Sequence, residues 1–289
     1  MTRVLTELVE LLALERIEEN LFRGQSQDLG WGQVFGGQVL GQALSAAVQT
    51  VDSARHVHSL HAYFLRIGDA RRPIVYQVER LRDGGSFSTR RVVAVQGGHP
   101  IFNMAASFHV DEPGYEHADR MPDVPGPDGL PSELELWTQY SQRLPESARS
   151  RALAERPIEL RPVDPIDPFA PEKRGPTHAV WVRAAGALPD DPALHRYLLA
   201  YCSDFSFVTT AMRPHGATWV DPRVQVASLD HVMWFHRPFR MDEWLLHVME
   251  SPSASGARGL VRGSVFSRDG RLVASTGQEG LIRQRTRGR

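Results

Sequence analysis

Residues Leu194–Phe207 read LHRYLLAYCSDFSF and form the stretch that decides the fold. Asp191 followed by Pro192 is typical of a helix start, because aspartate caps a helix and proline at the first position has no N–H to lose. Apolar residues then recur at three- and four-residue steps and fill the other faces as well. We therefore expect a central helix that is buried on nearly every side and interrupted by one acid, Asp204.

That acid needs a reason to be there, because an ionised carboxylate inside an apolar surrounding is costly unless it is paired or hydrogen-bonded. Two interpretations of Asp204 stay open at this point. Its carboxylate could hydrogen-bond to Ser203, Ser206 or a nearby backbone group, or it could serve as a catalytic base.

Composition excludes several classes of function. The chain has 289 residues and a net charge of −1, which gives no basic field, so we expect no nucleic-acid partner. The single lysine, Lys173, lies among prolines and argues against a phosphate-binding loop or a Schiff base. The single cysteine, Cys202, excludes a disulfide framework and a thiolate metal cluster. Without a signal-peptide pattern or an apolar run long enough to span a bilayer, a cytoplasmic protein with no membrane span is expected.

The first part of the chain reads as two helices followed by hairpins. We expect an amphipathic helix over 3–18 and a second one over 34–48, whose small residues let another surface approach its backbone. The pair Gly36–Gly37 at its start could offer backbone N–H groups to a phosphate or a thioester carbonyl of a substrate, or could simply allow close packing. Glycine-containing turns then join four strands, at 58–66, 74–81, 86–96 and 100–109.

The same pattern returns after a proline-rich segment. Residues 113–176 hold twelve of the 20 prolines, so we interpret them as a linker packed on the surface. A strand, the buried helix and further strands follow, at 178–183, 224–235, 244–250, 257–267 and 272–282. A helix without a polar face needs a sheet curled around it. The predicted fold is therefore α+β, with two tandem hot-dog domains at 1–112 and 177–289, each a long buried helix wrapped by an antiparallel sheet.

Several short segments resemble the hallmark stretches of the acyl-CoA thioesterase II family. They cover nearly the whole chain and are LFRG at 21–24, VFGGQ at 34–38, HAYFLRIGD at 61–69, DHVMWFHRP at 230–238 and QEG at 278–280. The resemblance implies a double hot-dog hydrolase that splits medium- to long-chain fatty acyl-CoA into free acid and CoA. It implies no cofactor, since CoA is part of the substrate. The chain departs from the family at Ser228, where several bacterial members carry threonine, and at Ile67, where proline is usual.

The resemblance also implies a catalytic set of three residues: Asp204, Ser228 and Gln278 would hold the attacking water. The chemistry of the side chains agrees with this, because direct attack by water on a thioester requires a proton acceptor, an orienting group and a donor for the oxyanion. Asp204 would accept the proton, and Ser228 and Gln278 would orient the water while backbone N–H groups stabilise the oxyanion. From its strand alone, Gln278 could equally be a solvated side chain.

Other candidate residues carry weaker signals. His56, His58 and His61 are spaced like metal ligands but have no carboxylate at ligand spacing, so no metal site is predicted. His58 could contact the acyl-CoA or cap the start of its strand. No G-x-S-x-G elbow occurs, and Cys202 lies in an apolar helix that makes a thiol inert. Some arginines could meet the phosphates of CoA, namely Arg66, Arg71, Arg72, Arg90 and Arg91.

Two functions of other classes remain as alternatives. A hot-dog hydratase would pair a histidine with the acid, but Phe205, Ser206 and Phe207 follow Asp204 instead. A non-catalytic acyl-CoA sensor would keep the fold and lose the polar set. That set is intact in the second half, whereas the first helix carries no acid, so one active site per pair of repeats is predicted. Free sheet edges favour a homo-oligomer, either a dimer or a tetramer.

Overall fold

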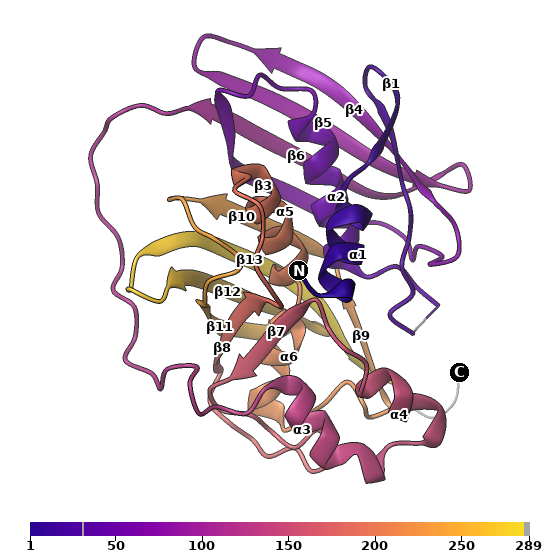
Figure 1. Ribbon diagram of the computed structural model, residues 1–289. Helices are drawn as coiled ribbons and strands as arrows, with labels where there is room; N and C mark the ends of the chain where they lie inside the picture. The colour runs from indigo at the N-terminus through magenta and orange to yellow at the C-terminus, as the bar shows by residue number, and fades with distance from the viewer. Residues whose placement is uncertain (31, 286–289) are drawn as a thin grey trace.

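The computed structural model describes residues 1–30 and 32–285. Two curved sheets, each wrapped around a helix, lie one above the other and join edge to edge (Figure 1). The first half contains α1 (Arg3–Leu12), β1 (Glu15–Glu18), β2 (Leu21–Gly24), α2 (Gly36–Val48), β3 (Arg55–Phe64), β4 (Ile74–Asp83), β5 (Phe87–Gln96) and β6 (His99–Val110). The second half contains β8 (Thr177–Ala184), α5 (Pro192–Ser203), α6 (Phe207–Met212), η2 (Arg213–His215), β9 (Val224–Ser228), β10 (Asp230–Phe235), β11 (Leu245–Ser255), β12 (Arg258–Ser267) and β13 (Leu272–Gln284).

Strand order confirms the tandem hot-dog fold. The continuous sheet runs β1-β2-β4-β5-β6-β3-β10-β13-β12-β11-β8-β7, where β7 (Ile158–Pro162) comes from the segment between the halves. The order β2-β4-β5-β6-β3 of the first half is therefore repeated as β8-β11-β12-β13-β10 in the second. The halves meet where β3 pairs antiparallel with β10, with Leu60 opposite Met233 and His61 opposite Val232. All the pairs between the described strands are antiparallel, and apolar side chains on alternate residues face the helix.

Small residues let the two central helices approach each other closely. A Cβ added to Gly37 of α2 would overlap the backbone oxygen of Tyr201 in α5, and one added to Gly41 would lie 3.1 Å from the backbone oxygen of Tyr197. The predicted close approach to the second helix is therefore confirmed, and the partner is the central helix of the other half. The start of α2 consequently faces the end of α5.

Two predicted helices end earlier than the sequence pattern indicates. The first stops at Leu12 and the chain turns into β1, where Ile17 is exposed. The central helix begins as predicted, with Asp191 accepting a hydrogen bond from the N–H of Ala193, but it ends at Ser203. Apolar spacing continued past both ends and so did not mark them.

A left-handed residue separates α5 from the next helix. Ser206 has φ 68°, a conformation that a side chain other than glycine adopts at a cost. Its backbone oxygen accepts hydrogen bonds from the hydroxyls of Thr209 and Thr210, which hold the chain in this turn before α6 begins. Asp204 is thus the C-cap of α5 and stands in the break between two helices instead of inside one.

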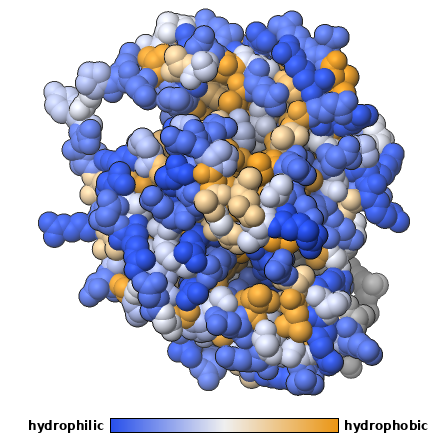
Figure 2. Space-filling view, viewed as in Figure 1, coloured by the Kyte–Doolittle hydropathy of each residue, from blue (hydrophilic) through white to orange (hydrophobic). Residues whose placement is uncertain are grey.

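The proline-rich segment does more than link the halves. Residues 111–120 are exposed, and the segment passes along the outside of the molecule, where the guanidinium of Arg237 contacts Glu116 and the backbone oxygen of His117 (Figures 1 and 2). Met121, Val124 and Leu130 then cover a cluster of apolar side chains that includes Trp181. Further on lie α3 (Glu133–Tyr140), η1 (Ser141–Arg143), α4 (Glu146–Ala152) and β7 (Ile158–Pro162). Since β7 pairs with β8, the predicted linker supplies the last strand of the second half's sheet.

The opposite edge of the sheet is strand β1, whose four residues are all exposed and include Glu15, Arg16 and Glu18. Charged side chains on an edge strand discourage further pairing. The predicted homo-oligomer stays a prediction, and β1 gives it no support.

Candidate active site

Asp204 is the centre of a hydrogen-bonded group built from four elements. The hydroxyl of Ser228, at the end of β9, donates to its Oδ1 at 3.2 Å, and Nε2 of Gln278, on β13, donates to the same oxygen at 2.9 Å. The backbone N–H of Gly37, in the first turn of α2, also hydrogen-bonds to the carboxylate. The structure therefore brings the three predicted catalytic residues together, at the junction between the two halves.

Strand pairing explains why residues fifty positions apart meet here. β9 pairs antiparallel with β13 so that Ser228 lies opposite Gly280, two residues from Gln278. Side chains two residues apart in a strand share a face. The two donors therefore project from the same face of the sheet toward the end of α5. The Gln278 side chain is 2% exposed, so it is not a solvated strand residue.

Burial makes Asp204 a weaker acid than an ordinary aspartate. The pKa of its carboxyl is raised from 3.8 to about 6. Desolvation causes the rise, and the hydrogen bonds from Gln278, Ser228 and Gly37 keep the pKa from rising further. Among the described residues, no basic side chain contributes to the shift. The carboxylate is thus held by neutral donors and the N-terminus of α2, which leaves it ionised at neutral pH and still able to accept a proton.

The two predicted glycines lie against the carboxylate of Asp204. The N–H of Gly37 is directed at the carboxylate, and the missing side chain of Gly36 leaves room for it, since a Cβ there would lie 2.6 Å from Oδ2 of Asp204. Phe64 of β3 closes the same space from the other side, 3.0 Å from that Cβ position. Any substrate contact by these glycines remains a prediction.

His58 does not lie in this group. Its Nε2 is 2.8 Å from Oγ of Ser107, and its ring contacts Phe87. It stands inside β3, six residues before Phe64 and so about 20 Å away along an extended strand. His58 therefore neither caps the start of the strand nor reaches Asp204, and the expected contact with acyl-CoA has no support from this position.

One residue of the site was not assigned from the sequence. His231 lies on β10 within the segment DHVMWFHRP, and its ring sits between Ser203 and Gln278. The pattern of a histidine next to an aspartate in an apolar strand was visible, but it does not tell which ring nitrogen will have a partner. Only the three-dimensional structure shows that Nδ1 of this ring lies 3.4 Å from Oε1 of Gln278.

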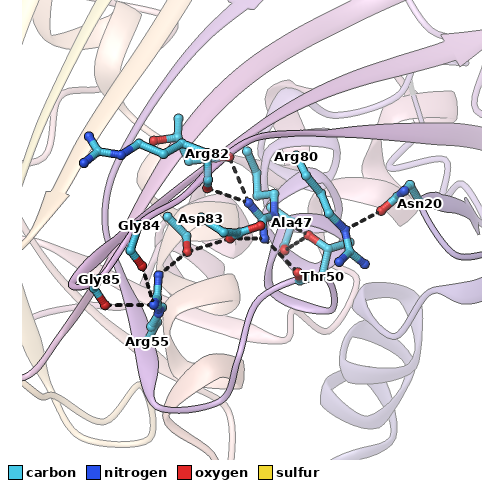
Figure 3. Close-up of polar contacts among 12 residues, drawn as sticks. Asn20, Ala47, Thr50, Arg55, Arg80, Arg82, Asp83, Gly84 and Gly85 are labelled. Atoms are coloured by element: carbon cyan, nitrogen blue, oxygen red, sulfur yellow. Dashed lines mark hydrogen bonds and ion pairs between the residues drawn. The ribbon is translucent and has the colours of Figure 1, made fainter.

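The first half carries a different polar group at the corresponding end of its helix. Just beyond α2, the guanidinium of Arg90, 1% exposed, donates to Oγ1 and the backbone oxygen of Thr50 and to Oδ1 of Asp83. Figure 3 labels the two partners, Thr50 and Asp83, and shows their hydrogen bonds as dashed lines. Ser88 and Arg55 extend this group toward the β4–β5 turn. The residue just past the helix of the first half is thus bound to a buried cation, whereas the helix of the second half ends at Asp204. Arg90 is therefore buried in the fold and is not available to the phosphates of CoA.

A cavity of about 170 Å³ lies near the site without including Asp204. It is bounded by α3, α6, strands β7 and β8 and the prolines at 162–171, and its wall is largely apolar and aromatic, with Trp137, Tyr140 and Trp219. Ser206 and Thr209, directly after Asp204 in the chain, form one side of it. The wall of the cavity therefore includes Ser206, which follows Asp204 by two residues in the chain.

Within 1–30 and 32–285, no three His, Cys, Asp or Glu side chains are grouped so as to hold a metal ion. No helix in that part of the chain is long and apolar enough to cross a membrane.

Comparison with known proteins identifies the family. Residues 147–281 match the family described as "Acyl-CoA thioesterase", and residues 26–109 match "Acyl-CoA thioesterase N-terminal domain". The chain is 46% identical over 283 residues to "Acyl-CoA thioesterase 2" of Haemophilus influenzae, covering 98% of this chain and 99% of the relative. It is 44% identical to human "Acyl-coenzyme A thioesterase 8", covering 94% of this chain and 88% of the relative.

A solved structure agrees. The crystal structure of the acyl-CoA thioesterase II TesB2 from Mycobacterium marinum superposes with a TM-score of 0.79 at 43% identity, covering 98% of this chain and 99% of that one. With the tandem hot-dog sheet and the full-length relatives, this shows that the chain belongs to the acyl-CoA thioesterase II family.

Proposed function

We propose that the protein hydrolyses medium- to long-chain fatty acyl-CoA to free fatty acid and CoA, with Asp204, Ser228 and Gln278 positioning the attacking water. The observation that carries this proposal is the carboxylate of Asp204, with its pKa of about 6, held by two neutral side-chain donors at the start of α2. The names of the full-length relatives support the class of substrate.

The reaction needs one proton acceptor and no covalent intermediate on the protein. A water molecule hydrogen-bonded to Asp204 attacks the thioester carbonyl carbon, and its proton passes to the carboxylate. The carbonyl oxygen then carries the negative charge of the tetrahedral intermediate. When that intermediate collapses, the carbon–sulfur bond breaks and the leaving thiolate takes the proton back from Asp204. Ser228 and Gln278 fix the carboxylate of Asp204 by their hydrogen bonds and so position the water bound to it, and attack occurs from a fixed geometry.

The cavity beside Ser206 and Thr209 supports a substrate with a long acyl chain. An apolar cavity of about 150 Å³ is known to hold a benzene molecule. The present cavity is of similar size, so it offers space for the distal carbons of a chain whose thioester lies at Asp204. Replacing Leu136, on the α3 side of the cavity, by tryptophan would fill that space from a surface helix. We expect Leu136→Trp to lower kcat/KM for long chains about tenfold and to leave short chains unchanged.

The test measures the release of CoA from acyl-CoAs of increasing chain length. The free thiol of CoA is detected by its reaction with a thiol reagent. We expect turnover that rises from short to medium and long chains, with kcat/KM falling about tenfold per pH unit below pH 6 as Asp204 becomes protonated. Absence of CoA release from every acyl-CoA would overturn the proposal. Hydration of an enoyl-CoA without CoA release would favour a hydratase, and tight binding of acyl-CoA without turnover would favour a sensor.

The geometry favours hydrolysis over both alternatives. The partners that the described residues give Asp204 are a serine, a glutamine and a backbone N–H, none of which can act as the second acid or base that a hydratase uses. A sensor would have no need for a carboxylate that burial has made a better proton acceptor. Cytoplasmic location and homo-oligomerisation stay predictions from the sequence.

A further inference from the structure

A second layer of buried polar side chains lies behind Gln278. Nδ1 of His231 is 3.4 Å from Oε1 of Gln278, and Nε2 of His231 is 2.9 Å from Oγ of Ser203. The three residues are 0–2% exposed, so solvent does not compete for their hydrogen bonds. They belong to β10, to β13, which carries a donor to Asp204, and to the last turn of α5, which ends at Asp204.

The chemistry of Asp204 fixes the direction of this chain of hydrogen bonds. An ionised carboxylate only accepts, so the side-chain amide of Gln278 must present its NH2 to Asp204, as the 2.9 Å contact from Nε2 shows. Its Oε1 then faces the imidazole of His231. An amide oxygen only accepts as well, so the nitrogen facing it, Nδ1, must carry the imidazole proton.

The remaining ring nitrogen completes the chain. A neutral imidazole has one N–H, so Nε2 of His231 accepts from the hydroxyl of Ser203, whose proton also has the backbone oxygen of Ala200 at 3.0 Å and Sδ of Met233 at 3.4 Å within reach. Burial keeps the imidazole neutral by lowering the pKa of His231 to about 4. Donors therefore run in one direction, from Ser203 through His231 and Gln278 to Asp204.

The opposite tautomer would damage the site. With its proton on Nε2, His231 would turn a lone pair toward Oε1 of Gln278, and two acceptors would face each other. Rotating the amide by half a turn would relieve that contact but would place Oε1 against the carboxylate of Asp204. In a buried site each arrangement leaves polar groups unpaired or opposed, which is unfavourable because no water compensates for the lost hydrogen bonds.

We propose that His231 is a positioning residue for thioester hydrolysis: its Nδ1–H holds the side-chain amide of Gln278 with the NH2 directed at Asp204. This inference rests on the proposed function. The groups packed around the ring are uncharged, since Phe207 of α6 lies 5.4 Å from it and also contacts His247, whose pKa burial lowers to about 3. His231 therefore acts through hydrogen-bond direction and not through its own charge.

The test compares two amides at position 231. The amide nitrogen of asparagine lies close to the place of Nδ1, whereas that of glutamine reaches the place of Nε2. We expect His231→Asn to keep kcat within about threefold of the wild type, and His231→Gln to lower it about 100-fold with little change in KM. The variant His231→Gln should also shift the acid limb of the kcat/KM profile to higher pH, because Asp204 loses a donor that lowers its pKa.

A purely structural role gives a different pattern. If both amides lower kcat equally, or if both leave it unchanged, or if the acid limb stays in place for His231→Gln, the proposal is wrong. Should either variant fail to fold, the 15N chemical shifts of the His231 ring in the wild-type protein test the same hydrogen bonds. We expect Nδ1 to carry the proton and Nε2 to be unprotonated. A His231 ring with its proton on Nε2 would contradict the proposal.

The experiments distinguish a failure of the proposed hydrolysis from a failure of the proposed role of His231. The wild-type protein is assayed first with the acyl-CoA panel, and absence of CoA release there overturns the proposed hydrolysis whatever the variants do. With an active wild type, the variants at position 231 report on positioning alone.

Discussion

Replacing Asp204 by asparagine should stabilise the protein at neutral pH while removing its activity. Asparagine has nearly the same shape as aspartate, and its Oδ1 accepts the hydrogen bonds that Ser228 and Gln278 now donate to the carboxylate. The substitution removes only the negative charge. The wild-type protein carries this charge in a partly buried site at every pH at which it is active, and this lowers its stability. Functional sites commonly carry such a cost in stability.

The magnitude follows from the shift in pKa. Burial raises the pKa of Asp204 from 3.8 to about 6, and each pKa unit corresponds to about 1.4 kcal/mol, so ionising the folded protein costs about 3 kcal/mol more than ionising the unfolded chain. Between these two values the folded state binds more protons than the unfolded state. The free energy of unfolding of the wild type therefore falls as pH rises from 3.8 to 6, and the loss is complete above pH 6.

Urea unfolding of both proteins at pH 4, 5, 6 and 7.5, followed by tryptophan fluorescence, measures this effect. The asparagine variant lacks the titrating group, so its free energy of unfolding minus that of the wild type should grow by about 2.4 kcal/mol from pH 4 to pH 7.5, since about 0.6 of the total of about 3 kcal/mol is already present at pH 4. All other groups titrate alike in the two proteins and cancel in the difference. A difference that stays constant with pH, or shrinks as pH rises, would refute the account of why this carboxyl is a weak acid.

Three further substitutions test the surroundings of the site and the fold. Gly36→Ala places a Cβ about 2.6 Å from Oδ2 of Asp204, so kcat should fall about 100-fold while the melting temperature changes little, and a fully active variant would contradict the tight fit. Ser228→Ala removes one hydrogen bond to the carboxylate and should lower kcat/KM about tenfold, whereas Ser228→Thr should retain it; equal effects of the two would exclude the hydroxyl as the cause. Arg90→Met leaves the partners of the buried guanidinium without a donor and should lower the free energy of unfolding by about 3 kcal/mol or more. The control Arg91→Met, on the exposed face of the same strand, should lower it by about 0.5 kcal/mol or less. Similar losses in the two variants would show that burial of Arg90 does not cause the destabilisation.

The sequence predicts much of the fold because burial leaves periodic patterns. An apolar helix and alternating strands recur in the same order twice, and a helix without a polar face requires a sheet around it. The break after Ser203 carries no such mark, because serine is not a residue that signals a left-handed turn. The hydroxyls of Thr209 and Thr210 stabilise it only once the chain has turned.

The site is less predictable than the fold for a related reason. Asp204 can be singled out from the sequence, because an acid among apolar residues needs a partner. Its side-chain partners, however, are brought to it by the pairing of β9 with β13, which no local sequence pattern predicts. The role of Gly37 depends on the docking of one half against the other. His231 becomes meaningful only after the direction of each hydrogen bond is worked out in three dimensions. Long-range contacts therefore supply what the local pattern cannot.

The measurement that bears most directly on the central claim is the rate of CoA release from a saturating medium- or long-chain acyl-CoA by the wild type and by Asp204→Asn at pH 7.5. A carboxylate that accepts the proton of the attacking water contributes a factor of about 100 or more to turnover. We expect the folded variant to bind the substrate and to release CoA at least about 100-fold more slowly. Turnover near that of the wild type in the folded Asp204→Asn protein would remove Asp204 from the reaction and contradict the account.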